Sequence, residues 1–248
     1  MSLNERTHYR NAPIVEAAID IRCLFPNPAP LATLSAVQER LAELYPLRED
    51  LLELRAQIGP AAAVTSQHTV TGIRLLNPER TQVVALTGDG FTFSRLAPYD
   101  RWETLRDEAF RIWGLYREVT APPGVSRVGV RYVNRLDLPR SASQGVELDQ
   151  FLRTAPKIAP ELPQSLESFF LRFQLALPGP RAGTLIITEA VVEPTSQEVI
   201  SVVLDIDVFA SNLDTTSEQA WEFIERFRDQ KNLAFESCIT EATRALIR

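Results

Sequence analysis

The sequence predicts an α+β protein with mainly antiparallel sheets and helices packed on one face of them. Three observations support this fold class. Several segments alternate apolar and polar residues with the period of two that is typical of half-buried strands. Other segments carry apolar residues at helical spacing. The order strand, helix, strands, helix also occurs twice, which predicts two similar halves, residues 1–122 and 123–248, packed as one compact unit.

The first half begins with an alternating strand and ends with an amphipathic helix. Pro26 ends the strand, and the apolar residues from Leu31 to Leu44 then predict a helix that stops at Pro46. Turn signals such as Thr87-Gly88-Asp89-Gly90 separate the shorter strands that follow. The predicted elements are strand Ile14–Phe25, helix Leu31–Leu44, strands Gly72–Leu76, Thr81–Leu86 and Phe91–Phe93, and helix Tyr99–Arg117.

The second half follows the same plan. Its final helix is predicted to begin at a capping box, Thr215-x-x-Glu218, and its apolar positions continue to Leu246, which gives a helix about 45 Å long if it is continuous. The predicted elements are strand Val125–Leu138, a short helix Leu148–Thr154, strands Ser168–Leu177, Thr184–Val192 and Val199–Phe209, and the final helix.

The strand Val125–Leu138 is the least ordinary segment of the chain. One of its faces carries Val128, Val130 and Tyr132 and fits a core, whereas the opposite face carries three arginines, Arg127, Arg131 and Arg135. Each arginine is about 13 Å from the next, because a strand rises about 3.3 Å per residue. We therefore expect each guanidinium to contact its own neighbours on adjacent strands.

Three other strands also combine an apolar face with a charged one. The charged residues that we expect near the three arginines are Glu16, Asp20, Arg172, Asp205 and Asp207. Together with Arg127, Arg131 and Arg135 they are the candidate ligand-binding residues. Arg131 is central among the arginines, and we expect it to be mostly buried and to form an ion pair with Glu16, Asp20, Asp205 or Asp207.

Composition excludes several classes of protein. The 248 residues are 45% hydrophobic, enough for a full core, and the net charge of -6 disfavours a general nucleic-acid binder. No apolar run reaches the length of a membrane span, and the polar start of the chain is unlike a signal peptide. The two cysteines, Cys23 and Cys238, fall at apolar positions and read as buried thiols. We expect a cytoplasmic protein, and homo-oligomerisation is left open.

Catalytic motifs are scarce in the sequence. His8 and His68 are far apart and give no metal-ligand spacing, and no phosphate-binding glycine loop, Gly-x-Ser-x-Gly elbow or Cys-x-x-Cys pair occurs. We therefore expect no metal and no cofactor. One exception stays open, because Asp205 and Asp207 lie on one strand face as in Asp-x-Asp motifs of magnesium-dependent phosphoryl enzymes.

Four motifs resemble those of a sporadically distributed prokaryotic family of uncharacterised proteins. They are Tyr9-x-Asn11-Ala12-Pro13-Ile14-Val15-Glu16-Ala17, Phe91-x-Phe93 with Tyr99-x-x-Trp102, Arg127-x-Gly129-x-Arg131-Tyr132-x-Asn134-Arg135, and Phe235-Glu236-x-x-Ile239-Thr240. The resemblance covers nearly the whole chain. It implies no activity, cofactor or partner.

The charged strand faces have two interpretations. In one, the arginines bind an anionic ligand and the carboxylates orient them. In the other, the same residues form cross-strand ion pairs on a solvated sheet face. Our leading hypothesis is a non-enzymatic module that binds a protein or a small anionic partner through the charged face or a cleft between the halves. The alternatives are a Mg-dependent nucleotide or phosphoester enzyme that uses Asp205 and Asp207, or a nucleic-acid clamp.

Overall fold

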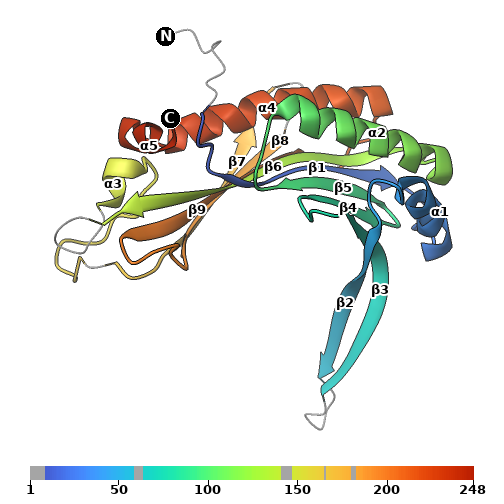
Figure 1. Ribbon diagram of the computed structural model, residues 1–248, viewed down its shortest axis with the longest axis horizontal. Coiled ribbons are helices and arrows are strands. Elements are labelled where there is room, and N and C mark those ends of the chain that lie inside the picture. Colours follow the sequence, from blue (N-terminus) through green and yellow to red (C-terminus); the bar gives the residue numbers. More distant parts are fainter. Residues whose placement is uncertain (1–8, 59–63, 141–146, 165, 180–182) are drawn as a thin grey trace. The chain divides into compact units, whose positions relative to one another are not determined.

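The computed structural model describes residues 9–58, 64–140, 147–164, 166–179 and 183–248 (Figure 1). For residues 54–58 and 64–68 it describes the backbone but no side chains, so the side chain of His68 lies outside the description, as does the whole of His8. Within these ranges the chain forms nine strands and five helices. The α+β class is confirmed, with the sheet as its dominant part.

The strands are β1 (Ile14–Leu24), β2 (Leu47–Ile58), β3 (Val64–Leu76), β4 (Gln82–Thr87), β5 (Gly90–Leu96), β6 (Gly124–Pro139), β7 (Phe170–Leu177), β8 (Gly183–Val192) and β9 (Val199–Ala210). The helices are α1 (Leu31–Leu41), α2 (Trp102–Thr120), α3 (Leu148–Phe151), α4 (Ser217–Cys238) and α5 (Glu241–Ile247).

The nine strands follow one another in the order β2-β3-β4-β5-β1-β6-β9-β8-β7. Pairing is antiparallel in each of the neighbouring pairs β2–β3, β3–β4, β4–β5, β7–β8 and β8–β9. The strands β2 and β7 therefore end the sheet. Short connections explain the local pairings, because antiparallel neighbours need only a hairpin turn between them.

The chain divides into two compact units that do not follow its order. Unit 1 comprises Met1–Ala17, Val130–Ala210 and Glu225–Arg248, and unit 2 comprises Ala18–Gly129 and Ser211–Ile224. The segments β1, β6 and α4 each contribute to both units. The expected duplication of the halves at residue 122 stays a prediction.

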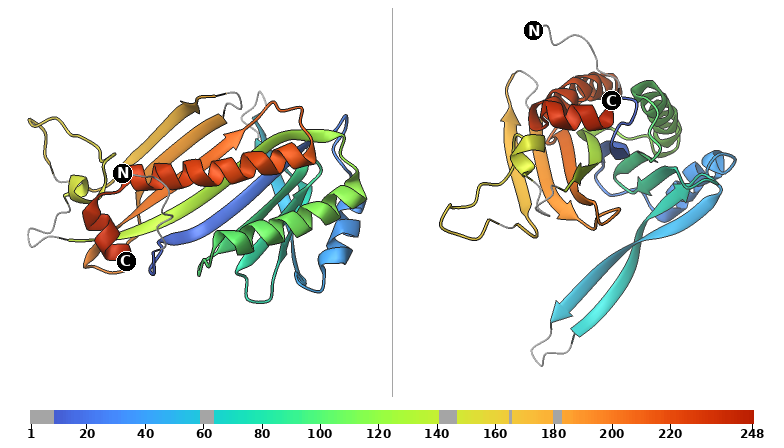
Figure 2. Two further views of the ribbon diagram at one scale, coloured as in Figure 1. Left: turned by 90° about the horizontal axis from the view of Figure 1, so that it is seen from above. Right: turned by 60° about the vertical axis from the view of Figure 1, so that its left-hand side comes forward.

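The core of unit 2 forms where α2 packs against β5. The predicted apolar stripe of this helix, which includes Trp113 and Tyr116, is buried, and both rings lie about 6 Å from the ring of Phe91 on β5. Beside it, β1 approaches β5 very closely: a Cβ atom on Gly90 would lie 2.1 Å from the carbonyl oxygen of Ile21. Only glycine fits there. The left panel of Figure 2 shows α2 lying across the strands of this unit.

The core of unit 1 is built from the apolar rows of β6 and β9 and the last part of α4. Val130 and Tyr132 on β6 and Leu204 and Ile206 on β9 are buried, as the alternation predicts. Asn134 lies in the same row and is also buried, and its amide donates to the carbonyl oxygen of Leu204 at 3.0 Å. That bond satisfies a polar group that would otherwise destabilise the core.

The structure departs from the sequence-based expectations at β2, at the last helix and at its cap. The segment Leu47–Ile58 was not expected to be a strand, because its charged residues give no clear alternation, yet it forms a long ribbon with β3 (Figure 1). The last helix is not continuous: it ends at Cys238, and Thr240 caps a separate helix, α5. The capping box is one residue later than expected, since Thr216 and Gln219 bond to each other's backbone amides.

Candidate functional site

The eight candidate residues divide between the two compact units. Asp20 and Arg127 belong to unit 2, and the other six belong to unit 1. The contacts of each group follow from the strands that carry them, since side chains on one face of neighbouring strands lie opposite one another.

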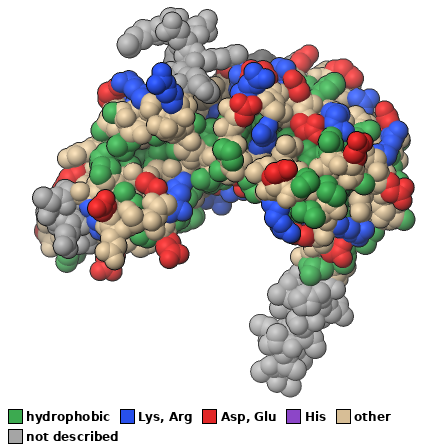
Figure 3. Space-filling view, in the orientation of Figure 1, with side chains coloured by type: hydrophobic (Ala, Val, Ile, Leu, Met, Phe, Trp, Pro, Cys, Tyr) green, Lys and Arg blue, Asp and Glu red, His purple; other side chains and the backbone are tan. Residues whose placement is uncertain are grey.

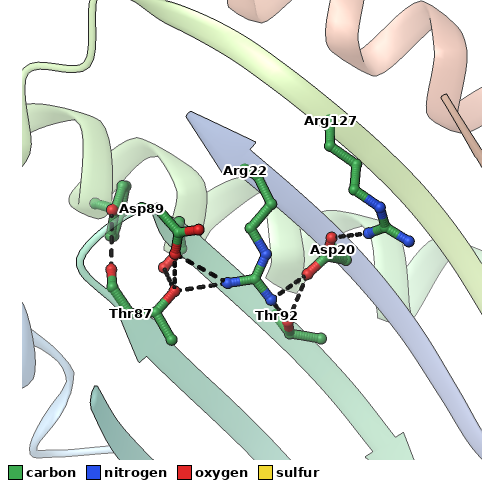
Figure 4. Close-up of polar contacts among 8 residues, drawn as sticks. Asp20, Arg22, Thr87, Asp89, Thr92 and Arg127 are labelled. Carbon is green, nitrogen blue, oxygen red and sulfur yellow. Dashed lines mark hydrogen bonds and ion pairs between the residues drawn. The ribbon is translucent and has the colours of Figure 1, made fainter. Parts of the chain in front are cut away.

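Asp20 is the centre of a polar cluster in unit 2 (Figure 4). This Asp20 cluster contains Asp20, Arg22, Thr87, Asp89, Thr92 and Arg127. Asp20 accepts from Arg22 Nη2 and from Thr92 Oγ1, both at 2.8 Å, and its other oxygen accepts from Arg127 Nη1. The side chain of Asp20 is 15% exposed, so both of its oxygens are engaged away from bulk solvent.

Arg22 extends the Asp20 cluster toward the hairpin between β4 and β5. Its Nη1 donates to Thr87 Oγ1 at 2.6 Å and to Asp89 Oδ1 at 3.3 Å, and the hydroxyl of Thr87 donates to the same oxygen of Asp89 at 2.7 Å. Two carboxylates therefore balance two guanidiniums. This geometry favours the cross-strand ion-pair interpretation, because the donors are directed at the protein's own acids.

Arg131 forms the expected ion pair in unit 1. Its Nε and Nη2 donate to the two oxygens of Asp205 at 2.9 and 2.7 Å, a bidentate geometry that fixes both side chains. This bonding raises the pKa of the guanidinium, to which the charges of Glu16 and Asp207 also contribute. The expectation that Arg131 is mostly buried is wrong: its side chain is 51% exposed, against 16% for Asp205. The reason is that Arg131 reaches along the solvated face of the sheet to its partner.

Arg135 belongs to a second polar group in unit 1, around Asp137. It donates to Asp137 at 3.3 Å, to Ser201 at 3.1 Å and to the carbonyl oxygen of Glu193 at 2.6 Å. Burial tends to raise the pKa of Asp137, but hydrogen bonds from Ser201, Thr195 and Arg135 lower it below its ordinary value.

Arg172 joins neither group. It is exposed on β7 and makes no ion pair with a residue that the structure describes.

Removal of the Arg131–Asp205 pair is expected to have a modest effect. We expect the cycle Arg131→Met, Asp205→Asn and the double variant to give a coupling energy of about 1 kcal/mol in urea unfolding, because the pair is half exposed but bidentate. The exposed pair Arg48 and Asp50, at 3.0 Å, is the control and is expected to give less than about 0.5 kcal/mol. A coupling of 3–5 kcal/mol, the range for fully buried pairs, would contradict this assignment.

A cavity that the sequence did not indicate lies in unit 1. Its volume is about 720 Å³, and it lies between the segment around α3 and the ends of β8 and β9. Its lining includes five apolar residues that are buried or half-buried, Leu148, Leu152, Ile158, Val191 and Ile200. Six exposed charged residues also line it, Arg140, Arg153, Lys157, Glu147, Asp149 and Glu167. The volume is in the range of small-molecule sites.

A buried acid lies beside this cavity. Glu189 is fully buried on β8, on the same strand face as the cavity residue Val191. Its Oε1 accepts from the hydroxyl of Thr154, the neighbour of Arg153, while Oε2 has no hydrogen-bond partner among the described residues. Burial raises the pKa of Glu189. A sequence signal did exist, because Glu189 interrupts the apolar row of Leu185, Ile187 and Val191.

Lys231 was also missed by the sequence analysis. Its ammonium nitrogen lies 3.5 Å from the ring centroid of Tyr132, which is itself buried. Burial and the nearby charge of Arg228 lower the pKa of Lys231 to about 7. The interaction is a cation–π contact when the lysine is charged. The polar stretch of α4 that carries Lys231 therefore packs partly against the core.

Comparisons with known proteins add no relative. No family model matches the chain, and no curated protein matches it. Among the described residues, no helix is long and apolar enough to cross a membrane, and no group of three or more His, Cys, Asp or Glu residues could hold a metal ion. The resemblance to the prokaryotic family stays a prediction.

Proposed function

We propose that the chain is a non-enzymatic binding protein and that the cavity of unit 1 holds its ligand, a small molecule with an apolar body and an anionic head. The observation that carries this proposal is the cavity itself, about 720 Å³ with apolar residues and a charged rim. Apolar walls with a few polar groups at their border are typical of small-molecule sites.

Two basic side chains of the rim support an anionic head. Arg153 and Lys157 line the cavity, and neither side chain has an ion pair with a described residue. Arg153 is exposed at the rim, and its backbone N–H donates to the carbonyl oxygen of Cys238 at 2.7 Å, which ties the segment after α3 to the end of α4. A carboxylate or phosphate head that bonds to Arg153 would therefore leave the apolar body of the ligand against Leu152 and Val191.

The charged strand faces support this function less well. In the Asp20 cluster and at Arg131 the guanidiniums are bonded to carboxylates of the same unit, which leaves few donors for an external anion. The magnesium-dependent alternative is weakened in the same way, since both oxygens of Asp205 accept from Arg131. Figure 3 shows basic and acidic side chains interspersed over the face drawn there, a pattern that does not favour the nucleic-acid clamp.

Calorimetric titration with decanoate, decyl phosphate and decanol tests the proposal. We expect both anions to bind, and decanol to bind at least about tenfold more weakly because it lacks the charge-assisted hydrogen bonds. Arg153→Gln is expected to weaken the preferred anion about tenfold, as loss of one such bond predicts. Comparison of decanoate with decyl phosphate identifies the head group.

Arg172→Gln is the matched control for this experiment. Arg172 is an exposed arginine of the same unit outside the cavity, so its replacement should leave the affinity unchanged. The proposal fails if neither anion binds, or if Arg172→Gln weakens binding as much as Arg153→Gln does.

A further inference from the structure

The strand β7 is an apolar edge of the sheet. It is the last strand in the sheet order, β8 is its one neighbour among the described strands, and Figure 2 shows it at the margin of the sheet. Phe170 is 68% exposed, Phe173 38% and Leu175 46%. The sequence predicted a buried apolar face for this strand, and that expectation is wrong because no described element covers it.

Natural edge strands usually carry features that prevent pairing with another chain. Lysines, prolines, bulges and short length are the common ones. The eight residues of β7, F-L-R-F-Q-L-A-L, include neither lysine nor proline, and their register against β8 is regular from Phe170 to Leu177. Arg172 is the one charged residue in the strand. A regular, apolar and exposed edge of this kind is a template for a further strand.

We propose that β7 pairs antiparallel with β7 of a second copy of this chain, about a two-fold axis at Phe173. The residue pattern is symmetric about that position. Leucines lie two residues away on both sides, at 171 and 175, and polar residues lie one residue away on both sides, at 172 and 174. A two-fold interface requires this kind of self-complementary surface.

The symmetric register gives favourable pairs at each position. Phe173 faces Phe173 of the second copy, and Leu171 faces Leu175, so one face of the new pair is wholly apolar. On the other face Arg172 lies opposite Gln174, whose amide oxygen accepts from a guanidinium, and the two arginines do not face each other. Phe170 lies opposite the small Ala176. A shift by two residues would lose these matches.

The other terminal strand does not offer the same surface. In β2 the consecutive residues Arg48, Glu49 and Asp50 are all charged, and Arg48 bonds to Asp50 within the strand. Charged residues on an edge discourage pairing. We therefore assign the dimer contact to β7, because it is a terminal strand of the sheet and, unlike β2, is mostly apolar.

Sedimentation of the full chain tests the dimer. We expect a monomer–dimer equilibrium across about a hundredfold range of protein concentration, since mass action makes the dimer fraction concentration-dependent. Phe173→Lys should weaken the dimer about tenfold or more, because two like charges then face each other at the axis. The control Leu162→Lys alters a residue of the same unit that is 57% exposed and outside β7, and it should leave the equilibrium unchanged. Phe173 is already exposed, so its variant should remain folded, as circular dichroism checks.

Cysteine cross-linking tests the register. Directly opposed residues of antiparallel strands have Cα atoms about 4.5–5.5 Å apart, within the range of disulfides. We expect Phe173→Cys to form a disulfide dimer under mild oxidation, whereas Leu171→Cys and Leu175→Cys should form one when mixed but not separately. The native Cys23 and Cys238 are buried and should not interfere.

Three results would overturn the proposal. The first is a wild-type chain that stays monomeric at all concentrations, which would assign the edge to another partner or to none. The second is a dimer that Phe173→Lys leaves intact. The third is cross-linking that is equal at positions 171, 173 and 175. None of these results bears on decanoate or decyl phosphate binding, so the cavity proposal is tested separately.

Discussion

Replacement of Val130 by aspartate is expected to lower the free energy of unfolding by more than about 4 kcal/mol, or to prevent folding altogether. Val130 is fully buried on β6, between Val128 and Tyr132, which are also buried. A carboxylate at this position has no counter-ion within the apolar row and would be removed from water. Urea unfolding followed by circular dichroism measures the loss.

Val133→Asp is the matched control for this substitution. Val133 lies on the opposite face of the same strand, is partly exposed, and lies between Arg131 and Arg135. The same aspartate should cost less than about 1 kcal/mol there, because it remains hydrated and faces positive charges. Equal losses at positions 130 and 133 would mean that both faces of β6 are buried.

Replacement of Glu189 by glutamine is expected to stabilise the protein at neutral pH by about 1–3 kcal/mol. Glu189 is fully buried, and one of its oxygens has no hydrogen-bond partner among the described residues. Glutamine keeps an oxygen that accepts from Thr154 and carries no charge that burial could penalise. Thermal and urea unfolding of both proteins at pH 7 measure the gain.

The stability gain from Glu189→Gln is expected to increase as pH rises. Burial raises the pKa of Glu189, so the folded state keeps this proton at a pH where the unfolded chain has lost it. From the ordinary glutamate pKa of about 4.3 up to the raised value, the contribution of Glu189 to the free energy of unfolding falls as pH rises. Below that window Glu189 is protonated in both states and the two proteins should differ little. A difference that is independent of pH would show that Glu189 does not titrate as proposed.

The alternation of residues was sufficient to predict the faces of β6 and β9. Burial of Val130 and Tyr132 and the position of Arg131 on the opposite face follow from a period of two, because successive side chains of a strand point to opposite faces. The exposure of Arg131 was not predicted. The partner of Arg131 was also among the expected carboxylates. The stripe of α2 was predicted for a similar reason, since helical spacing places Trp113 and Tyr116 on one side.

The local residue pattern did not predict that Leu47–Ile58 is a strand, nor that the apolar row of β7 is exposed. The charged segment Leu47–Ile58 forms a strand by pairing with β3, the next strand along the chain, and this pairing is not visible in the residue pattern of the segment itself. In β7 the apolar row is real, but the sheet ends there and no described element covers it. Alternation shows which residues share a face, and it does not show what lies against that face.

The sequence by itself determined the α+β class, the apolar rows, the ion-pairing character of the arginine strand and the absence of familiar catalytic motifs. These properties depend on neighbours within a few residues. Only the tertiary structure decided how the carboxylates divide among the arginines, where the cavity lies, that Glu189 has an oxygen without a partner, and that β7 is an exposed edge. Each of these depends on segments that are distant in the chain and are brought together by burial of apolar surface. Because this driving force has no direction, the local pattern does not specify which segments meet.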